Sequence, residues 1–486
     1  MISKFILDLV KYTPSKIFPA AFAVLIIPVI TRLLSADLYG EYVIVTSTLA
    51  VLVIITTEWI TMSIIRYYSS YERDSKLPDF YFTILSATFI SLMLINILLL
   101  LNYSFNQILI SSDIYDYFIY IIIILDIGII YNIFMQFLVV QRKPSTYSFF
   151  YIYRQCVCIL IGVFIAWTFK SEVRGLLQGT IIGHIIILPI LFLIVMHRKK
   201  FGKFSTGLFK NCMKYGIPLV ITNLAGWILT LSDRFIIKYF RGNLEVGIYS
   251  ISYKVAEQTI YSIILLIGLA SAPLIMDSWE NKGAEETVKF IEKLTKIFLI
   301  VSIPAATGIS LISKPLIEML ATPSYYSGYK IIPIVAFGVL IFGLQRNFQV
   351  ALLIFKRTNY VMYLTLIAGI INIVLNVIFI PKYGYFAAAY TTLLSYLLFA
   401  ILMIIISRKY LKWKFPMITL AKVIVSSFIM SLAVSMTLRL NIANVISKLS
   451  LSVVTGIIMY STFIILLKEI DIKEMYIHYK KKVNKN

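Results

Sequence analysis

The chain has 486 residues, of which 60% are hydrophobic and only 14% are charged, and its mean hydropathy is +0.88. Soluble domains have about 25% charged residues, and a soluble core of this size could not bury so much apolar surface. These numbers exclude a soluble protein and indicate a membrane protein. The net charge of +22 would favour a nucleic-acid ligand in a soluble chain. In a membrane protein it is typical of basic cytoplasmic loops, so we predict no nucleic-acid partner.

Apolar stretches of about 20 residues recur along the chain, and each is long enough to cross roughly 30 Å of hydrocarbon as a helix. The first follows Lys4, Lys11 and Lys16 without a small-residue cleavage site, so we expect no cleaved signal peptide. The stretches predict an all-α, polytopic membrane protein with about fourteen spans. They lie at 12–33, 42–65, 80–101, 117–140, 147–168, 175–196, 215–237, 246–271, 293–313, 330–351, 359–380, 386–406, 417–438 and 450–467.

Lys and Arg are distributed unevenly between the two sides of these spans. They are concentrated at both ends of the chain and in the loops on the same side, including the run His197-Arg198-Lys199-Lys200. The positive-inside rule places that side, and therefore both termini, in the cytoplasm. Two termini on one side require an even number of spans, and fourteen meets that requirement.

Sequence signals of catalysis are missing. The hydrophilic connections are too short for an extramembrane catalytic domain, and there is no HExxH, P-loop or Gly-x-Ser-x-Gly motif. The three cysteines, Cys156, Cys158 and Cys212, do not have the spacing of a zinc site. We therefore predict that the protein is not an enzyme and holds neither a metal nor a cofactor.

The second half of the chain repeats features of the first at an offset of roughly 200–215 residues. The matched pairs, in chain order, are Tyr12-x-Pro14 with Tyr215-Gly216-Ile217-Pro218, Arg32 with Asp233-Arg234, Gly40-Glu41-Tyr42 with Gly247-Ile248-Tyr249, Gln141-Arg142-Lys143 with Phe355-Lys356-Arg357, and Gly175-Leu176-Leu177 with Gly384-Tyr385-Phe386. Each half has six spans, so the halves are parallel, and transporters built in this way bind their substrate between the halves. We predict two pseudo-symmetric six-helix lobes, 1–200 and 201–410, followed by two further helices and a cytoplasmic tail at 411–486.

Three segments carry a more specific signal: Arg32-Leu33-Leu34-Ser35-Ala36-Asp37-Leu38-Tyr39-Gly40-Glu41-Tyr42, Leu231-Ser232-Asp233-Arg234-Phe235-Ile236-Ile237 with the Gly247 motif, and Asn372-Ile373-Val374-Leu375-Asn376 before Ile380-Pro381-Lys382-Tyr383-Gly384. Together they resemble the polysaccharide-exporter branch of the multidrug/oligosaccharidyl-lipid/polysaccharide exporter superfamily. Ile64-Ile65-Arg66-Tyr67-Tyr68 is similar to the arginine-bearing second helix of related lipid flippases. The resemblance implies a flippase that moves an undecaprenyl-pyrophosphate-linked glycan across a bacterial cytoplasmic (inner) membrane, for O-antigen or capsule biosynthesis. Its expected partners are that glycan, membrane lipids and other polysaccharide-assembly proteins of the membrane.

Basic residues inside the spans are candidates for binding the pyrophosphate. A charge in the membrane centre costs at least about 2.5 kcal/mol on insertion scales, so it indicates a functional site, and arginine binds phosphate in a bidentate geometry. Arg154 in the fifth span and Lys254 in the eighth are too deep for easy snorkelling to the headgroups. Nearer the predicted ends of spans, where an interfacial position is an alternative, the candidates are Arg32, Arg66, Arg234 and Arg346.

Acidic residues and a histidine inside the spans are candidates for coupling to H⁺ or Na⁺. Asp126 in the fourth span is positioned either to pair with Arg154 on the next helix or to act as a coupling carboxylate. Lys254 and Glu257 are three residues apart on one helix face, so a local pair is the simpler interpretation. His184 is either a titrating group or a histidine hydrogen-bonded to a neighbouring helix, and Glu58 is similarly ambiguous.

The alternative function is an ion-coupled antiporter of drugs or organic cations from the same superfamily. Such a pump requires a predominantly anionic cavity, whereas the deep charges of this chain are mainly basic. The sequence therefore favours an anionic lipid-linked substrate moved by alternating access between the two lobes.

Overall fold

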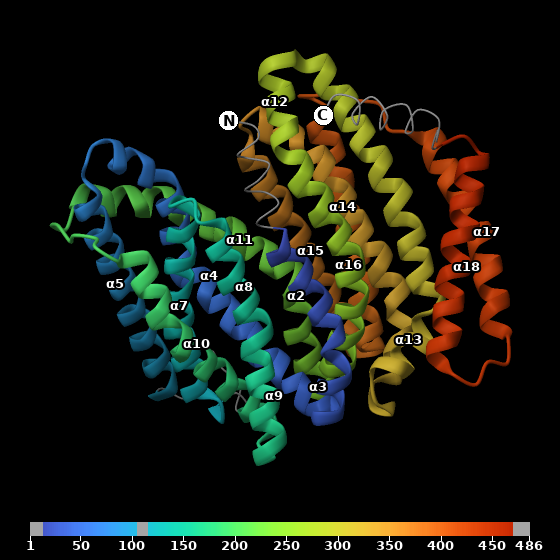
Figure 1. Cartoon of the computed structure of the whole chain (residues 1–486), viewed down its shortest axis with the longest axis horizontal. Coiled ribbons are helices and arrows are strands. Elements are labelled where there is room, and N and C mark those ends of the chain that lie inside the picture. Colours follow the sequence, from blue (N-terminus) through green and yellow to red (C-terminus); the bar gives the residue numbers. More distant parts are fainter. Residues whose placement is uncertain (1–12, 105–114, 470–486) are drawn as a thin grey trace. The chain divides into compact units, whose positions relative to one another are not determined.

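The structure, a computed structural model, describes residues 13–104 and 115–469. Lys4, Lys11 and Tyr12 and the tail beyond Glu469 lie outside the described residues. Within that part the regular elements are helices (Figure 1). They are α2 (Pro14–Leu25), α3 (Ile27–Leu33), α4 (Ala36–Arg73), α5 (Leu77–Ser104), α7 (Phe118–Val140), α8 (Pro144–Ile152), the π-helix η1 (Tyr153–Val157), α9 (Cys158–Phe169), α10 (Glu172–Met196), α11 (Thr206–Arg241), α12 (Asn243–Leu311), α13 (Ser313–Leu320), the 3₁₀-helix η2 (Pro323–Ile331), α14 (Ile332–Ile354), α15 (Thr358–Tyr383), α16 (Tyr385–Ser407), α17 (Met417–Arg439) and α18 (Val445–Leu466).

The predicted all-α membrane fold is confirmed. In the described part of the chain, twelve helices are long and apolar enough to cross a membrane, or thirteen if the bent pair α2 and α3 forms one span. Only the Leu274–Leu311 part of α12 enters this count. The first part of α12 contains the predicted span at 246–271, and with it the number agrees with the prediction of about fourteen.

Two predicted segments differ from the structure for identifiable reasons. The first span, predicted as one helix at 12–33, is bent by 41° between α2 and α3. Pro28 stands at the start of α3, where it has no N–H to donate and its ring displaces the carbonyl of the residue four positions earlier. The predicted connection at 273–292 is mostly helical, because α12 continues through it. The direction of α12 changes at Gly283, whose φ of 83° glycine adopts without strain.

Contacts between residues divide the chain into two compact units. The first consists of Met1–Ser250 and Thr365–Ala388, and the second of Ile251–Leu364 and Ala389–Asn486. In the first unit α4 packs against α11 and α7, and α10 packs against α9 and α7; in the second, α17 packs against α18. These units do not coincide with the predicted lobes, 1–200 and 201–410, so that division stays a prediction.

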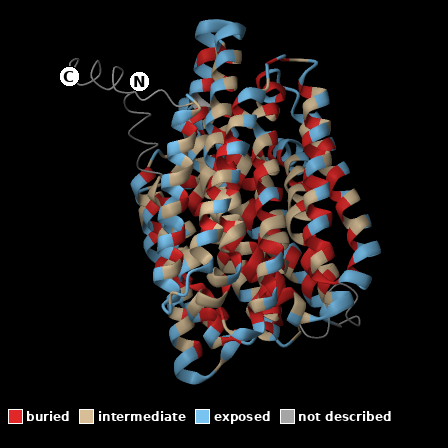
Figure 2. Ribbon diagram, turned by 90° about the vertical axis from the view of Figure 1, so that its right-hand side faces the viewer, coloured by how far each residue is buried: buried red, intermediate tan, exposed pale blue. Residues whose placement is uncertain are grey.

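The helices expose many large apolar side chains. Figure 2 shows that exposed residues occur along the middle of the helices as well as at their ends. Phe89, Leu98 and Leu193 are each about 60% exposed. Contiguous apolar surface of this extent is rare in soluble proteins, and a lipid environment accounts for it. The first unit also has an aromatic core around Phe80, Tyr81, Phe137 and Phe150.

Candidate functional site

Arg154 lies in a local irregularity of its helix. It is the second residue of η1, a π-helix of 5 residues between α8 and α9, and such π-turns are frequent at functional sites. Its Nη1 donates to Asn132 Oδ1 on α7 at 3.3 Å, and its guanidinium lies 5.2 Å from the centre of the Tyr131 ring. In the described part of the chain, Arg154 forms no ion pair with a carboxylate. Its charge is therefore held by neutral groups.

A second cation and two more tyrosines belong to the same group. The Tyr147 and Tyr151 rings stack with 5.9 Å between their centres, and Lys16 Nζ of α2 lies 4.9 Å from the centre of Tyr151. Tyr131 donates its hydroxyl hydrogen to the Phe150 carbonyl at 2.9 Å. We define the Arg154 cluster as Lys16, Tyr131, Asn132, Tyr147, Tyr151 and Arg154. It contains two positive charges and no carboxylate.

The sequence did carry a signal for part of this cluster that our prediction missed. Tyr147, Tyr151 and Arg154 have the spacing i, i+4 and i+7, which brings side chains to one face of a helix. All three are half-buried, so they are partly accessible. Lys16 had no comparable signal, because nothing local shows that α2 packs against α8.

His184 lies next to the cluster on α10. It is only 4% exposed, and its ring meets the Tyr131 ring edge-on with 5.2 Å between the centres. Its Nδ1 is 2.7 Å from the Thr180 carbonyl of its own helix, rather than hydrogen-bonded to a neighbouring helix. Its Nε2 is buried and has no hydrogen-bond partner among the described residues. With a proton on Nδ1, the Nε2 lone pair points into the protein without a donor.

Asp126 does not pair with Arg154, so the first of the two roles that the sequence offered for Asp126 is wrong. Both carboxylate oxygens of Asp126 accept from Asn96 Nδ2 on α5 at 3.0 Å. Arg154 instead donates to Asn132. Asn132 lies six residues beyond Asp126, which is about 9 Å along α7 at 1.5 Å per residue. Glu58 of α4 is also bound by an amide, because Asn223 Nδ2 of α11 donates to its Oε1 at 2.8 Å. Both carboxylates thus have neutral partners.

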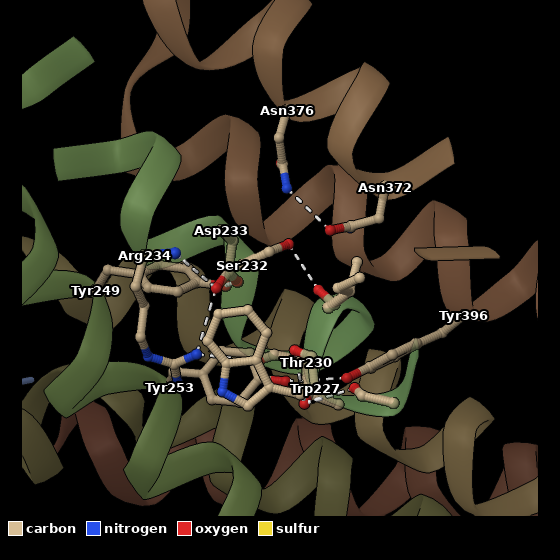
Figure 3. A network of polar contacts seen from close by, with 12 residues as sticks. Trp227, Thr230, Ser232, Asp233, Arg234, Tyr249, Tyr253, Asn372, Asn376 and Tyr396 are labelled. Atoms are coloured by element: carbon tan, nitrogen blue, oxygen red, sulfur yellow. Dashed lines mark hydrogen bonds and ion pairs between the residues drawn. The ribbon is translucent and has the colours of Figure 1, made fainter. Parts of the chain in front are cut away.

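Arg234 is buried within the protein. It is 7% exposed and Asp233 is 2% exposed, and Arg234 Nη1 lies 3.3 Å from Asp233 Oδ1 (Figure 3). The same nitrogen donates to the Thr230 carbonyl at 2.9 Å, and Tyr249 of α12 donates its hydroxyl hydrogen to Asp233. A local carboxylate therefore neutralises this arginine, in contrast to Arg154.

The other predicted bases are more accessible. Arg32 is exposed and donates to the Pro28 carbonyl at 2.8 Å, and Arg66 at the inner part of α4 is exposed. In the second unit Arg346 is exposed, and Lys254 is half-buried and interacts electrostatically with Glu257. Arg154 and Arg234 both lie over tyrosine rings, at 5.2 Å from the centre of Tyr131 and 5.8 Å from that of Tyr249, and Arg234 also has a carboxylate partner.

An all-helical protein with many spans and with charged side chains inside them has the architecture of a membrane transporter. The comparisons with known proteins agree. The profile of the polysaccharide biosynthesis protein family matches residues 11–279, and the MatE profile matches residues 218–378. The chain belongs to the polysaccharide biosynthesis protein family, and so to the multidrug/oligosaccharidyl-lipid/polysaccharide exporter superfamily that the sequence resembled.

Flippases and transporters are found among the individual matches. The chain is 24% identical over 281 residues to the probable low-salt glycan biosynthesis flippase Agl15 of Haloferax volcanii, covering 55% of this chain and 58% of that protein. It spans about half the length of the curated relatives it matches. Its fold is similar to the lipid II flippase MurJ in an inward-closed conformation, with a TM-score of 0.77, 16% identity and coverage of 96% of this chain and 99% of MurJ. An inward-facing multidrug MATE transporter has a TM-score of 0.62 at 12% identity, covering 81% of this chain and 94% of the transporter.

Proposed function

We propose that this transporter flips an oligosaccharide linked to undecaprenyl pyrophosphate, from the inner to the outer leaflet of a bacterial cytoplasmic membrane, for surface polysaccharide such as O-antigen or capsule. The name of Agl15 describes a glycan biosynthesis flippase and that of MurJ a lipid II flippase, which supports a lipid-linked glycan as the substrate class. On this proposal both termini are cytoplasmic, and other polysaccharide-assembly proteins of the membrane are partners.

The Arg154 cluster carries the proposal. A lipid pyrophosphate brings about two negative charges into a medium of low dielectric, where each requires a cation or hydrogen-bond donors. Arg154 and Lys16 supply two cations without carboxylate partners in the described structure, and Asn132 supplies an amide. The half-buried Tyr147 and Tyr151 rings offer stacking surfaces and hydroxyl groups to a sugar next to the phosphates. We assign the pyrophosphate to Arg154 and Lys16.

Two of the predicted acidic residues have a supporting role in this proposal. Asp126 and Glu58 are the candidates for coupling to H⁺ or Na⁺, because the hydrogen-bond partner of each carboxylate is an uncharged amide that does not neutralise it. The same observation favours the second candidate function, an ion-coupled antiporter of organic cations. The two functions differ in the charge of the substrate.

Transport in reconstituted vesicles tests the proposal. The purified protein is placed in liposomes with a fluorescent undecaprenyl-pyrophosphate disaccharide, and a membrane-impermeant quencher measures how fast the probe changes leaflets. We expect Arg154→Gln to slow this exchange about tenfold or more, the usual cost of losing a charge-assisted contact to an anion. The matched control is Arg73→Gln, since Arg73 is the last residue of α4 and its side chain is 80% exposed.

Two results would contradict the proposal. One is a glycolipid flipping rate that is the same with the parent protein as in protein-free liposomes, while the protein transports a fluorescent organic cation in exchange for protons or sodium ions under an imposed gradient. The other is an Arg154→Gln variant that flips the glycolipid as fast as Arg73→Gln. The first outcome supports the cation antiporter, and the second removes Arg154 from the binding site.

A further inference from the structure

An apolar slot lies between α5, α7 and α10 of the first unit. α7 packs against both α5 and α10 (Figure 1). The slot has a volume of about 720 Å³, and its lining side chains come from 85–92 of α5, 130–134 of α7 and 185–193 of α10. On α7 the lining residue Phe134 is only 5% exposed, whereas Phe89 of α5 is 60% exposed. The slot is thus backed by α7 and opens to the surroundings beside α5.

The slot has the length and the chemistry that suit a lipid chain. From Ile185 to Leu193 the helix α10 rises by about 12 Å at 1.5 Å per residue, close to the roughly 15 Å of hydrocarbon in one leaflet. The polar lining residue Thr88 donates its hydroxyl hydrogen to the Ile84 carbonyl of its own helix at 2.9 Å. The lining side chains therefore offer no free hydrogen-bonding group. A polar ligand would lose its partners there, whereas an acyl chain requires none.

Basic side chains lie at one end of the slot. Tyr81 is one turn of α5 before the lining residue Leu85, so the two side chains share a face of the helix. Lys199 Nζ, from the connection after α10, lies 5.6 Å from the centre of the Tyr81 ring. Arg198 beside it is exposed. In the described part of the chain neither Lys199 nor Arg198 forms an ion pair with a carboxylate.

The chain segments around this end carry an excess of positive charge. Asp79, in the first turn of α5, accepts from the Lys203 backbone N–H at 2.8 Å and brings the connection after α10 onto α5. Seven lysines and arginines and two aspartates occur in the segments 74–79, 141–143 and 197–203. Phosphate is therefore the lipid group that complements this end of the slot.

We propose that the slot binds an anionic phospholipid, with one acyl chain along α7 and the phosphate at Lys199 and Arg198. On the predicted orientation this lipid belongs to the cytoplasmic leaflet. A chain gains little by leaving the bilayer for the slot, because both surroundings are apolar. The preference comes from the headgroup, since basic pockets between membrane helices attract anionic headgroups. Phosphatidylglycerol, which has no amine to neutralise its phosphate, fits better than phosphatidylethanolamine.

The slot and the Arg154 cluster lie on opposite faces of α7. Successive residues of a helix are about 100° apart, so Asn132, which binds Arg154, points about 200° away from both Ile130 and Phe134 of the slot. A phospholipid in the slot therefore leaves the proposed pyrophosphate site free, and a polyprenyl tail attached to that pyrophosphate starts on the other face. The inference does not depend on the proposed transport function.

Native mass spectrometry of the full-length protein measures the headgroup preference. The protein in detergent is titrated with phosphatidylglycerol or phosphatidylethanolamine, and the lipid-bound fraction gives a Kd. We expect the parent to bind phosphatidylglycerol at least about tenfold more tightly. Arg198→Gln/Lys199→Gln should weaken this binding about twentyfold, because each base near a membrane surface contributes about a factor of five. Arg408→Gln/Lys409→Gln, which removes two exposed bases after α16, is the matched control.

A tryptophan on α10 tests whether the chain lies in the slot. Leu188 is a half-buried lining residue, so Leu188→Trp fills space that the acyl chain needs. We expect phosphatidylglycerol binding to weaken about tenfold. Ile186→Trp is the matched control, because Ile186 is on the same helix, is 53% exposed and does not line the slot.

Four results would overturn the site. The headgroup assignment fails if the parent binds both lipids equally, or if Arg198→Gln/Lys199→Gln binds phosphatidylglycerol as tightly as its control. The slot fails if Leu188→Trp binds like Ile186→Trp. Displacement of bound phosphatidylglycerol by a lower concentration of undecaprenyl phosphate would assign the slot to a polyprenyl chain instead.

The parent protein decides the location if Leu188→Trp does not fold. Phosphatidylglycerol with a photoreactive group in its acyl chain is bound and illuminated, and the adducts are mapped by peptide mass spectrometry. We expect adducts in the slot segments of α5, α7 and α10. Adducts confined to other helices would overturn the site.

Discussion

Arg154 and Arg234 are both arginines within predicted spans, and their surroundings differ in one decisive respect. Arg234 has Asp233 beside it, so this buried pair has no net charge. Arg154 has an amide and an aromatic ring, which orient the guanidinium but leave its charge available to a ligand. A buried charge without a counter-ion is costly and persists where function requires it. The partner of an arginine, more than its depth, thus separates a structural residue from a candidate binding residue.

Removal of the Asp233 charge should destabilise the protein strongly. Asp233→Asn leaves Arg234 as an uncompensated buried cation, and the loss of one partner of a buried pair costs about 3–5 kcal/mol. We expect a clearly lower thermal unfolding midpoint in detergent. Asp37→Asn is the control, because Asp37 is exposed and a surface change costs at most about 0.5 kcal/mol. The double variant Asp233→Asn/Arg234→Gln should recover part of the loss. Equal midpoints for Asp233→Asn and Asp37→Asn would show that the pair does not stabilise the fold.

At the scale of helices, the C-terminal pair α17 and α18 is tied to α12 through one carboxylate. Glu469 follows α18, and its side chain is only 3% exposed. Its Oε1 accepts from Lys296 of α12 at 2.8 Å and from Thr419 of α17 at 2.6 Å, and its Oε2 lies 3.1 Å from Lys422. Burial acts to raise the pKa of Glu469, but the hydrogen bonds from these three residues outweigh it and hold the pKa below its usual value of 4.5.

The attachment of this pair should weaken in acid. Because the pKa of Glu469 is lower in the folded state, its contribution is present above pH 4.5 and is lost as the pH falls through the folded value. Both lysines are partly exposed, so we expect an effect of about 1 kcal/mol. Hydrogen exchange in α18 should be faster in Glu469→Gln than in the parent at pH 7, and the difference should shrink as the pH falls below 4.5. Glu285→Gln, with a side chain that is 84% exposed, is the control, and a parent–variant difference that does not shrink in acid would contradict this role of the carboxylate.

At the scale of the whole molecule, the distribution of charge makes a prediction about the sides of the membrane. Lys200, between α10 and α11, belongs to the densest internal basic run, and Asn441 lies in the connection between α17 and α18. With both termini in the cytoplasm, these two positions lie on opposite sides. In a cysteine-free background, an impermeant maleimide should label Asn441→Cys in intact cells and Lys200→Cys only after permeabilisation. Labelling of Lys200→Cys in intact cells would reverse the predicted orientation.

The amino-acid sequence by itself determined the class of fold. In lipid every backbone polar group must be satisfied within the helix, so each apolar stretch of about 20 residues has one available structure. This is why the spans at 417–438 and 450–467 reappear as Met417–Arg439 and Val445–Leu466, although only a short connection separates them. The resemblance to the exporter superfamily was also correct, since its motifs are local.

Only the tertiary structure decided which side chains meet. Asp126 contacts Asn96 and not Arg154, Lys16 lies over the Tyr151 ring, and Gly40 packs against the backbone of Asn243. These choices depend on which helices are neighbours and on how each is rotated about its axis. A nearly continuous apolar sequence specifies neither the neighbours of a helix nor its rotation, because every face of such a helix is equally compatible with lipid. The sequence therefore predicted the helices and the repeat, whereas the candidate site arises from contacts between helices that no local pattern specifies.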